Sequence, residues 1–534
     1  MNCLLEKMLQ RPSVSVFAFG RRRFVSGALA STASLVAAVC GAGVLPVPSA
    51  TVGNAVPRYV VFDEDNDHFF KSPASFMDEA HLEAYVDQIA AGGKTTHVFF
   101  CPTGWRASFD SKVWEPIWTG LAEYPEDKIW FLYRNWAKNA KALCDKGIDP
   151  YQVFIRRCRE KGVSPWLNPR MNDGHDGAVF GKQRPFRSTT FWREHLEYHF
   201  DPTCQTGSWT LHNLDYRHPE VREYALAMLR ELFERYDADG VNLLGRGWFP
   251  AEVARASEPI FDGFITEISR MRDEWSARRG HRILLSTFAA ATPERCREQG
   301  YDVARYLREG KLDWAVCSGS GVDLEAWRKE IAPRKDAVLL VHHPNVVGMG
   351  KGLPLFNPTA AELRGWADAV SLKDPDGYYL YNVEYHPETQ FEICRGGLLP
   401  KDTAALARHY KPWAKGVSLP LKMDKPVALT VDVGTPEGRA SLLFGFADAA
   451  PHDIAVTVNG VRPVWEHEER VERHVFSENR RERETQPAFG YHGRRCLFPA
   501  GTIRRGGNTV EIAPREGYEM TFLELQLLPA ENRM

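Results

Sequence analysis

The sequence predicts an α/β protein, a (β/α)8 TIM barrel followed by a smaller all-β sandwich domain. Eight short apolar, strand-like runs alternate with helix-like runs over about 350 residues. Polar side chains gather directly after several of these runs, and from about residue 422 the helical patterns nearly vanish. Eight βα units predict a closed parallel barrel whose site lies at the carboxyl ends of the strands.

The composition is that of a soluble globular protein. Of the 534 residues, 44% are apolar and 25% are charged, and the formal net charge is −2. Because so small a net charge creates no field that would recruit nucleic acid or an anionic membrane, we expect neither as a partner. The 15 Trp, 18 Tyr and 29 Phe suit a sugar-binding protein, although most of them are expected to fill cores.

The amino-terminal segment, residues 1–50, is predicted to be a twin-arginine signal. Arg21-Arg22-Arg23-Phe24-Val25 precedes a mild apolar run from Ala28 to Leu45, and small residues follow at Pro46 to Ala50. The apolar run is short and interrupted by Gly and Ser, which is typical of an exported signal and not of a membrane span. We therefore expect a secreted, periplasmic or extracellular protein, with no integral membrane span in the mature chain.

The ten cysteines are scattered and form no Cys-x-x-Cys pair. This spacing argues against a zinc site and against a disulfide framework. Cys101 and Cys317 lie inside apolar runs and are expected to be small core residues. We predict no metal and no cofactor.

The barrel, the expected catalytic domain, is assigned to residues 55–418. Each strand is expected to be a short apolar run and each helix a run with helical periodicity. The expected strands are 58–63, 95–101, 163–168, 239–244, 282–288, 312–318, 337–343 and 378–382. The expected helices are 77–91, 150–161, 219–236, 260–279, 293–299, 303–309, 324–332 and 360–371. Residues 106–149 are expected to be a long loop insertion with helical pieces.

The sandwich, an expected accessory domain, is assigned to residues 422–534. Its strands are short runs, most of which alternate apolar and polar residues, and Asn459-Gly460 marks a hairpin turn. The expected strands are 427–433, 440–444, 454–458, 509–512 and 521–527. Glu466 to Glu484 is dense in Glu, Arg and His and is expected to be a solvated loop.

The richest polar stretch follows the third barrel strand. Asn168, Arg170, Asn172, Asp173 and His175 come within a few residues of one another, and glycines there allow the backbone to bend. A solvated turn would also use Asp and Asn. The close grouping of Arg, His and carboxylate after a buried strand favours a site.

Hydrolysis of a glycosidic bond needs two carboxyl groups, one as acid and the other as nucleophile or base. Asp173 and Glu384 follow well-separated strands, so we predict them as the pair, with His175 as a further catalytic candidate. Asp63 or Asp65, after the first strand, could replace either acid. Each of these carboxylates could equally be a structural partner of a nearby Arg.

Other polar and aromatic residues near the strand ends are predicted to bind the substrate. Arg170 presents a planar donor fork suited to a sugar carboxylate or sulfate. Asp215 precedes a helix and could simply be a cap or turn residue. The predicted substrate-binding residues are Asp63, Asp65, Trp105, Arg170, Asn172, Asp215, Asn242, Arg246, Trp248, His343 and Tyr385.

Several segments resemble the bacterial glycoside-hydrolase-like TIM-barrel proteins, a group of glycosidase-like families. They are 63–67 (DEDND), 170–175 (RMNDGH), 214–224 (LDYRHPEVREY), 239–242 (DGVN), 291–294 (ATPE), 300–302 (GYD) and 309–313 (EGKLD). The resemblance implies a secreted carbohydrate-active protein that degrades a polysaccharide or oligosaccharide. The C-terminal sandwich resembles the galactose-binding-like modules found on such enzymes, which bind carbohydrate.

One departure from the family pattern concerns the fourth strand. Relatives commonly carry an Asp-Gly-Ile-Glu-Leu-Asp type of pattern, whereas this chain has Asn242 and Leu244 where acids are expected. A neutral amide cannot protonate a leaving group. Two alternatives to a glycoside hydrolase therefore stay open. One is a polysaccharide lyase for a uronate-containing glycan, which would use Arg170, Asn172, His175 and Tyr385. The other is a carbohydrate-binding barrel without catalysis.

Overall fold

A computed structural model provides the three-dimensional structure. It describes residues 58–65, 68–123, 131–173, 186–201, 212–245, 247–319, 321–343, 347–348, 355–356, 359–381, 392–395, 397–398, 408–410, 419–446, 451, 454–473 and 489–528. The predicted signal segment therefore lies outside the described residues, and the predicted domain boundaries stay predictions.

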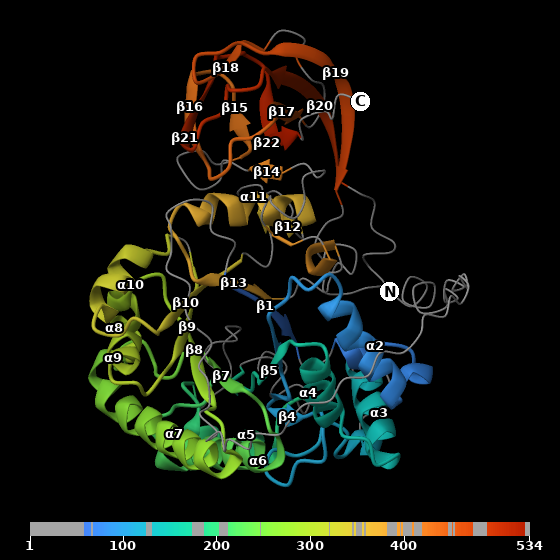
Figure 1. Cartoon of the computed structure of the whole chain (residues 1–534), viewed down its shortest axis with the longest axis vertical. Coiled ribbons are helices and arrows are strands. Elements are labelled where there is room, and N and C mark those ends of the chain that lie inside the picture. Colours follow the sequence, from blue (N-terminus) through green and yellow to red (C-terminus); the bar gives the residue numbers. More distant parts are fainter. Residues whose placement is uncertain are drawn as a thin grey trace, which may run out of the picture. The chain divides into compact units, whose positions relative to one another are not determined.

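Eight parallel strands close into a barrel, which confirms the predicted fold class (Figure 1). The ring closes because each strand pairs with its two neighbours, the last pair being β13 with β1. In order around the ring the strands are β1 (Tyr59–Glu64), β2 (His97–Phe100), β5 (Ser164–Leu167), β7 (Gly240–Gly245), β8 (Leu284–Ala289), β9 (Trp314–Cys317), β10 (Val338–His342) and β13 (Gly377–Tyr381).

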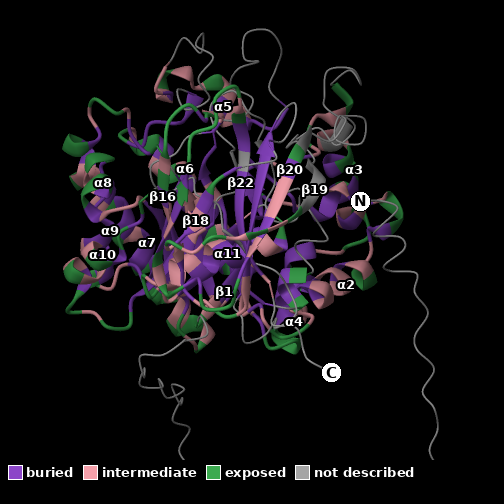
Figure 2. Cartoon of the chain, turned by 90° about the horizontal axis from the view of Figure 1, so that it is seen from above, coloured by how far each residue is buried: buried purple, intermediate pink, exposed green. Residues whose placement is uncertain are grey.

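Helices surround the strands (Figure 1), and exposed residues lie on the outward sides of these helices (Figure 2). Their starts follow local capping rules. Asp149 caps α4 by accepting from two backbone N–H groups, with Pro150 in the first turn, and Thr359 and Glu362 form a capping box on α11. The helices are α2 (Glu79–Ala90), α3 (Phe131–Asp145), α4 (Pro150–Glu160), α5 (Thr190–Glu194), α6 (Pro219–Arg235), α7 (Glu258–Arg279), α8 (Pro293–Glu298), α9 (Val303–Arg308), α10 (Leu324–Ile331) and α11 (Ala360–Ser371).

Short elements connect these strands and helices. The long insertion after β2 contains the fifteen-residue helix α3, so it is more regular than the sequence suggested. The 3-10 turns are η1 (Phe69–Lys71), η2 (Ala74–Phe76), η3 (Leu121–Glu123), η6 (Leu196–Tyr198) and η8 (Arg255–Ser257). The short strands are β3 (Thr103–Gly104), β4 (Arg106–Ala107), β6 (Arg170–Asn172), β11 (Val347–Gly348) and β12 (Leu355–Phe356).

An aromatic core fills the lower part of the barrel. The Trp166 ring stacks on Phe99 with centroids 4.7 Å apart and also lies 4.7 Å from the Trp314 ring. Gly240 makes room for this packing, because a Cβ at that position would lie 2.4 Å from a ring atom of Trp166. Val61, Val316, Leu340 and Tyr379 belong to the same buried cluster. This aromatic cluster therefore fills the barrel interior and closes it to passage from end to end.

The alternation of side chains along a strand explains why the apolar core of the barrel is followed by polar residues toward the carboxyl ends of the strands. Successive strand residues point to opposite faces, so residues two apart share a face. Val61 belongs to the interior core, and Asp63 and Asp65 continue its face beyond that core. In the same way Asn168 and Arg170 continue the face of Trp166. Asp63, Asp65, Asn168 and Arg170 are thus directed to the barrel interior at the carboxyl ends of the strands.

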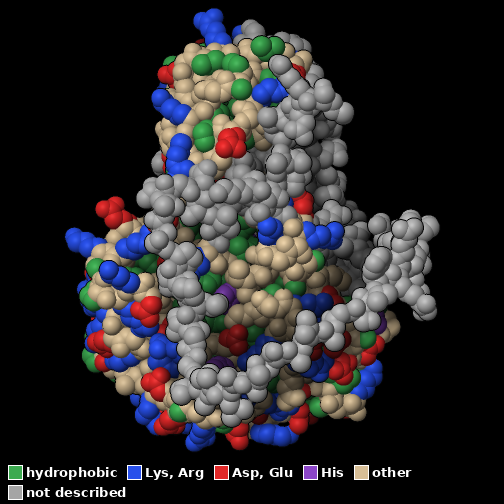
Figure 3. All heavy atoms as spheres, viewed as in Figure 1, with side chains coloured by type: hydrophobic (Ala, Val, Ile, Leu, Met, Phe, Trp, Pro, Cys, Tyr) green, Lys and Arg blue, Asp and Glu red, His purple; other side chains and the backbone are tan. Residues whose placement is uncertain are grey.

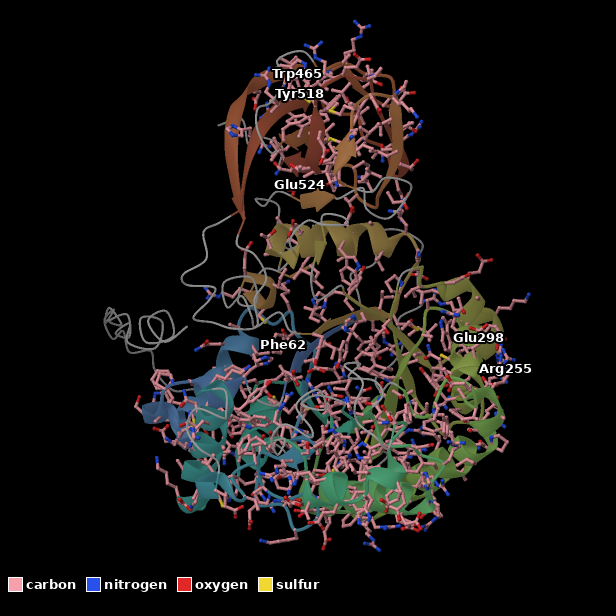
Figure 4. All side chains as sticks on the ribbon, turned by 180° about the vertical axis from the view of Figure 1, so that it is seen from behind. Phe62, Arg255, Glu298, Trp465, Tyr518 and Glu524 are labelled. Carbon is pink, nitrogen blue, oxygen red and sulfur yellow. The ribbon has the colours of Figure 1, made fainter. Side chains whose placement is uncertain are left out.

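The C-terminal region is built of antiparallel sheets that enclose a core of their own. A six-stranded sheet has the order β14-β22-β17-β20-β19, with β15 paired to β22, and a three-stranded sheet has the order β16-β21-β18. Trp465 and Tyr518, labelled in Figure 4, pack against this core. The strands are β14 (Arg408–Tyr410), β15 (Leu421–Lys422), β16 (Val427–Val433), β17 (Arg439–Phe446), β18 (Val456–Val458), β19 (Val464–Arg473), β20 (Phe489–Phe498), β21 (Gly506–Ile512) and β22 (Glu519–Leu528).

One local prediction in this region was wrong. The charged run Glu466 to Glu484 was expected to be a solvated loop, but its first part belongs to β19 (Val464–Arg473), which pairs with β20. β19 lies at the edge of its sheet. Edge strands carry charged side chains without losing their backbone pairing, so a charged run did not exclude a strand here.

Candidate functional site

Asp63 lies at the bottom of the polar end of the barrel. It is close to the end of β1 and is fully buried, with a relative exposure of 0%. Its Oδ2 accepts hydrogen bonds from the side-chain amide of Asn168 and from the hydroxyl of Tyr379. Two donors, one directly after β5 and one on β13, therefore hold this carboxylate in one orientation.

Asn242, the residue that replaces an expected acid, belongs to the same network. Its Nδ2 donates to Oδ1 of Asn168 over 2.6 Å, and Asn168 in turn donates to Asp63. Oδ1 of Asn242 and the hydroxyl of Ser286 are both buried and have no hydrogen-bond partner among the described residues. These two residues are aligned on the neighbouring strands β7 and β8. Asn242 thus orients Asn168 through its Nδ2, while its Oδ1 is a hydrogen-bond acceptor inside the barrel.

Arg170 joins two carboxylates above this layer. Its guanidinium pairs with Asp65 at 2.5 Å and with Asp173 at 3.2 Å, and it donates to the Tyr381 hydroxyl over 2.8 Å. All three charged side chains are largely buried, with exposures of 11%, 7% and 3% for Arg170, Asp65 and Asp173. Burial alone would lower the pKa of Arg170, but Asp65, Tyr381 and Asp173 raise it, so the guanidinium stays charged.

Three residues that were not among the predicted site residues complete the cluster. The ring of His342, at the end of β10, stacks on Tyr379 with centroids 5.7 Å apart and lies 5.9 Å from Tyr381. Tyr379 and Tyr381 share the inward face of β13 and donate to Asp63 and Asp65 respectively. In Figure 3, acidic and histidine side chains are visible near the middle of the barrel.

Asp173 follows β6, and Trp105 fixes its backbone. The indole Nε1 of Trp105 donates to the carbonyl oxygen of Asp173. Trp105 has an exposure of 1%, and its ring lies 5.7 Å from that of Trp114. In this structure Trp105 therefore positions Asp173 and presents no open ring face to solvent.

Asn172 and Asp215 bind the protein's own backbone. The amide of Asn172 donates to the carbonyl oxygens of Leu214 and Gly247 over 2.9 and 2.8 Å, and its Oδ1 accepts from the N–H of Leu214. Asp215 accepts from the N–H of Arg217 and pairs with its guanidinium. Both residues hold loops in place, so the turn-residue interpretation of Asp215 matches the observed contacts.

His343 is buried behind β13. The backbone N–H of Tyr381 donates to its Nδ1 over 3.1 Å, and this bond fixes the end of the strand. Burial lowers the pKa of His343 to about 3, so the ring is neutral at physiological pH. His343 therefore supports Tyr381, and its neighbour His342 is the histidine that lies against the two tyrosines.

Five predicted residues remain: Trp248, whose ring is buried, and four that lie outside the described residues. Trp248 has an exposure of 0%, and its ring packs against Tyr216 and Phe261. The other four, of which His175 and Glu384 are catalytic candidates and the rest binding candidates, lie outside the described residues: His175, Arg246, Glu384 and Tyr385.

A cavity of about 510 Å³ opens beside the polar cluster. It is lined by the end of β8, by residues that follow β7, β8 and β9, and by α8 and the segment after it. Phe288 lines this cavity and also contacts His342 and Tyr379, with ring centroids 5.6 and 5.3 Å away. The cavity and the cluster therefore share one wall.

Among the described residues, no group of three or more His, Cys, Asp or Glu is placed to hold a metal ion. Nor is any described helix both long and apolar enough to span a membrane.

Comparisons with known proteins find matches only among solved structures. No family model and no curated protein matches the chain. A maltogenic α-amylase from Thermotoga neapolitana is 12% identical, with a TM-score of 0.35 over 86% of this chain and 99% of its own. A GH18 chitinase from Cycas revoluta is 10% identical, with a TM-score of 0.36 over 63% and 98%.

A GH36 α-galactosidase from Geobacillus stearothermophilus is 11% identical, with a TM-score of 0.34 over 88% of this chain and 56% of its own. By name these three neighbours are an amylase, a chitinase and an α-galactosidase. Likeness of this degree assigns no reaction. The closed ring of paired strands by itself establishes the barrel.

Proposed function

We propose that this protein is a glycoside hydrolase that acts on a polysaccharide or oligosaccharide. The observation that carries the proposal is the set of three carboxylates, Asp63, Asp65 and Asp173, gathered at the carboxyl end of a closed barrel. Tyrosine hydroxyls, amides and one guanidinium hold these acids in place, as hydrolysis by positioned carboxyl groups requires.

Asp173 is assigned to the chemistry first, together with Glu384 from the segment after β13. Asp65 is the replacement if Glu384 is not the partner, because Arg170 joins it to Asp173. One carboxyl group would protonate the leaving oxygen while the other stabilises or attacks the sugar carbon. Asp63, held deeper by Asn168 and Tyr379, would orient these groups from below.

A screen of the purified protein tests the proposal. A panel of neutral, uronic and sulfated polysaccharides is incubated with the protein, and reducing ends and ultraviolet absorbance are read in parallel. Release of reducing ends alone supports a hydrolase. A parallel rise in absorbance reports an unsaturated product and makes the protein a lyase. The lyase alternative is weakened by Asn172, whose amide is occupied by backbone groups.

Conservative variants then identify the acids. On the substrate that the screen finds, Asp173→Asn and Glu384→Gln are each expected to lower kcat about 100-fold or more, the scale at which a positioned acid or base contributes. Glu274→Gln, on the exposed face of α7, is the control and should leave kcat unchanged. Full activity in Asp63→Asn, Asp65→Asn and Asp173→Asn would rule out this cluster as the catalytic centre.

A binding protein without turnover is the second candidate, and Asn242 favours it. This residue stands where an acid is expected and donates its amide to Asn168, so β7 contributes no carboxylate here. If no polysaccharide is cleaved, retention on one immobilised glycan that survives Asp173→Asn and Glu384→Gln would support binding alone.

We also propose export through the twin-arginine pathway. The support is the run of arginines at residues 21–23 followed by a mild apolar segment. Arg21→Lys combined with Arg22→Lys should retain the protein in the cytoplasm of a host that has this pathway. Export that is unaffected by the double substitution would contradict the proposal.

A further inference from the structure

The cavity beside the cluster has a built apolar wall. Phe249, Ala254, Phe288 and Ala289 line it and are almost fully buried, with exposures of 2–4%. Ala290 and Ala291 continue the wall at the rim. Side chains of a single carbon leave this space open, and a larger side chain at Ala290, on the rim, is expected to fill part of it.

The alanine segment is held firmly by its backbone. The N–H of Ala290 points to Sγ of Cys296 at 3.2 Å, and the carbonyl oxygen of Ala291 accepts from the N–H of Asp323 and from the indole of Trp327. Ala289 accepts from the N–H of Ser318. Bonds to α8 and to the segment before α10 therefore fix the shape of the wall, as expected for a preformed binding site.

The rim of the cavity is polar but balanced in charge. Arg295 pairs with Glu298 at 2.7 Å, and the Tyr301 hydroxyl donates to the side chain of Gln299 over 2.7 Å. Glu298 lies at the end of α8, away from the centre of the barrel (Figure 4). Among the lining residues that the structure describes, the cation Arg295 is paired with the anion Glu298, so these residues offer no net charge to a carboxylate or a sulfate.

We propose that this cavity is a subsite for an uncharged sugar unit of the glycan, adjacent to the unit held by the polar cluster. The apolar wall would contact the C–H face of the sugar or an N-acyl or methyl substituent, while the amide and hydroxyl groups at the rim bind its hydroxyls. Its volume of about 510 Å³ is typical of a small-ligand site. The inference rests on the proposed function, since it places this unit next to the proposed catalytic groups, and it predicts a preference for neutral over anionic glycans.

A space-filling variant tests the subsite on the full-length protein. The probes are β-1,4-linked hexasaccharides of glucose, mannose and N-acetylglucosamine, and hexagalacturonate as the anionic probe, with binding measured by calorimetry. Ala290→Phe is expected to weaken binding of the preferred neutral probe about 10-fold, which corresponds to roughly 1.4 kcal/mol. Ala277→Phe, at an exposed position of α7, is the matched control and should leave binding unchanged. Equal thermal stability of the two variants excludes a folding defect.

A charge variant provides the second arm. Glu298→Lys releases Arg295 and adds a cation, so hexagalacturonate should gain affinity while the neutral probe changes less than about 2-fold. Neutral binding that is unaffected by Ala290→Phe, or no binding of any neutral probe, would overturn the subsite. If Ala290→Phe weakens binding but no glycan is cleaved, the subsite stands and the hydrolase proposal fails.

Discussion

Replacing Arg170 by Gln is expected to destabilise the protein strongly at neutral pH and much less in acid. The guanidinium contacts Asp65 and Asp173, and neither carboxylate has more than 7% of its side chain exposed. Gln keeps a polar side chain but removes the charge. Two anions would then remain in a low-dielectric interior without the cation that offsets their desolvation.

The expected loss can be estimated from the burial of the pair. Removing one partner of a buried ion pair costs about 3–5 kcal/mol in the free energy of unfolding. The loss should shrink as the pH falls toward about 4, where unperturbed carboxyl groups take up protons. In the variant, protonation neutralises the acids that Arg170 no longer stabilises, so the folded variant gains relative to the wild type as the pH is lowered.

Chemical unfolding at pH 7 and at pH 4.5, followed by tryptophan fluorescence, measures the difference between variant and wild type. Arg270→Gln is the control, because Arg270 is 57% exposed and its surface ion pairs should contribute less than about 1 kcal/mol. A loss at pH 7 no larger than that of the control would refute the reasoning. So would a difference that grows as the pH is lowered.

Three further predictions concern the interior. Gly240→Ala should lower the free energy of unfolding by about 1–3 kcal/mol, because its Cβ meets the Trp166 ring; Gly263→Ala on α7, where a Cβ meets nothing, should not. His343→Gln should reduce the pH dependence of the free energy of unfolding. The pKa of His343 is about 3 in the folded protein and about 6.5 in the unfolded chain, so this histidine lowers the stability of the wild type by about 2 kcal/mol between pH 7 and pH 5. If urea unfolding gives both proteins the same change in stability between these two pH values, the prediction is wrong. Tyr379→Phe removes a donor to the buried Asp63 and should lower the free energy of unfolding by about 1.5–3 kcal/mol. It should also lower kcat on any substrate found; a kcat equal to that of the wild type would exclude Tyr379 from the site.

The barrel was predictable because the same sequence pattern, an apolar run followed by helical periodicity, is repeated along the chain. Eight apolar runs separated by helical periodicity leave few alternatives, and the strands lie within a few residues of their expected positions. The carboxylates after the first and third strands were predictable for a similar reason, since parallel strands bring their carboxyl ends together. Arg170 and Asp65 are far apart in sequence yet form an ion pair.

The rest of the site depends on contacts that no local pattern encodes. Tyr379 and Tyr381 looked like ordinary strand residues, although their spacing of two placed them on one face, and comparing that face with the core would have revealed them. Asn172 looked like a substrate ligand, but its bonds to Leu214 and Gly247 arise from the path of a distant loop. The charged strand β19 was hidden because an edge position tolerates polar side chains.

The packed rings of Trp166, Phe99 and Trp314 restrict the ways in which a polymer could bind to the barrel. Because these side chains fill the barrel interior, a glycan of the proposed kind could not pass through the barrel from end to end. Whatever enters at the carboxyl side also has to leave there. A chain can either lie across the opening, with units on both sides of the reacting one, or insert one terminus. For the proposed hydrolase, product release would then compete with binding of the next substrate at a single opening.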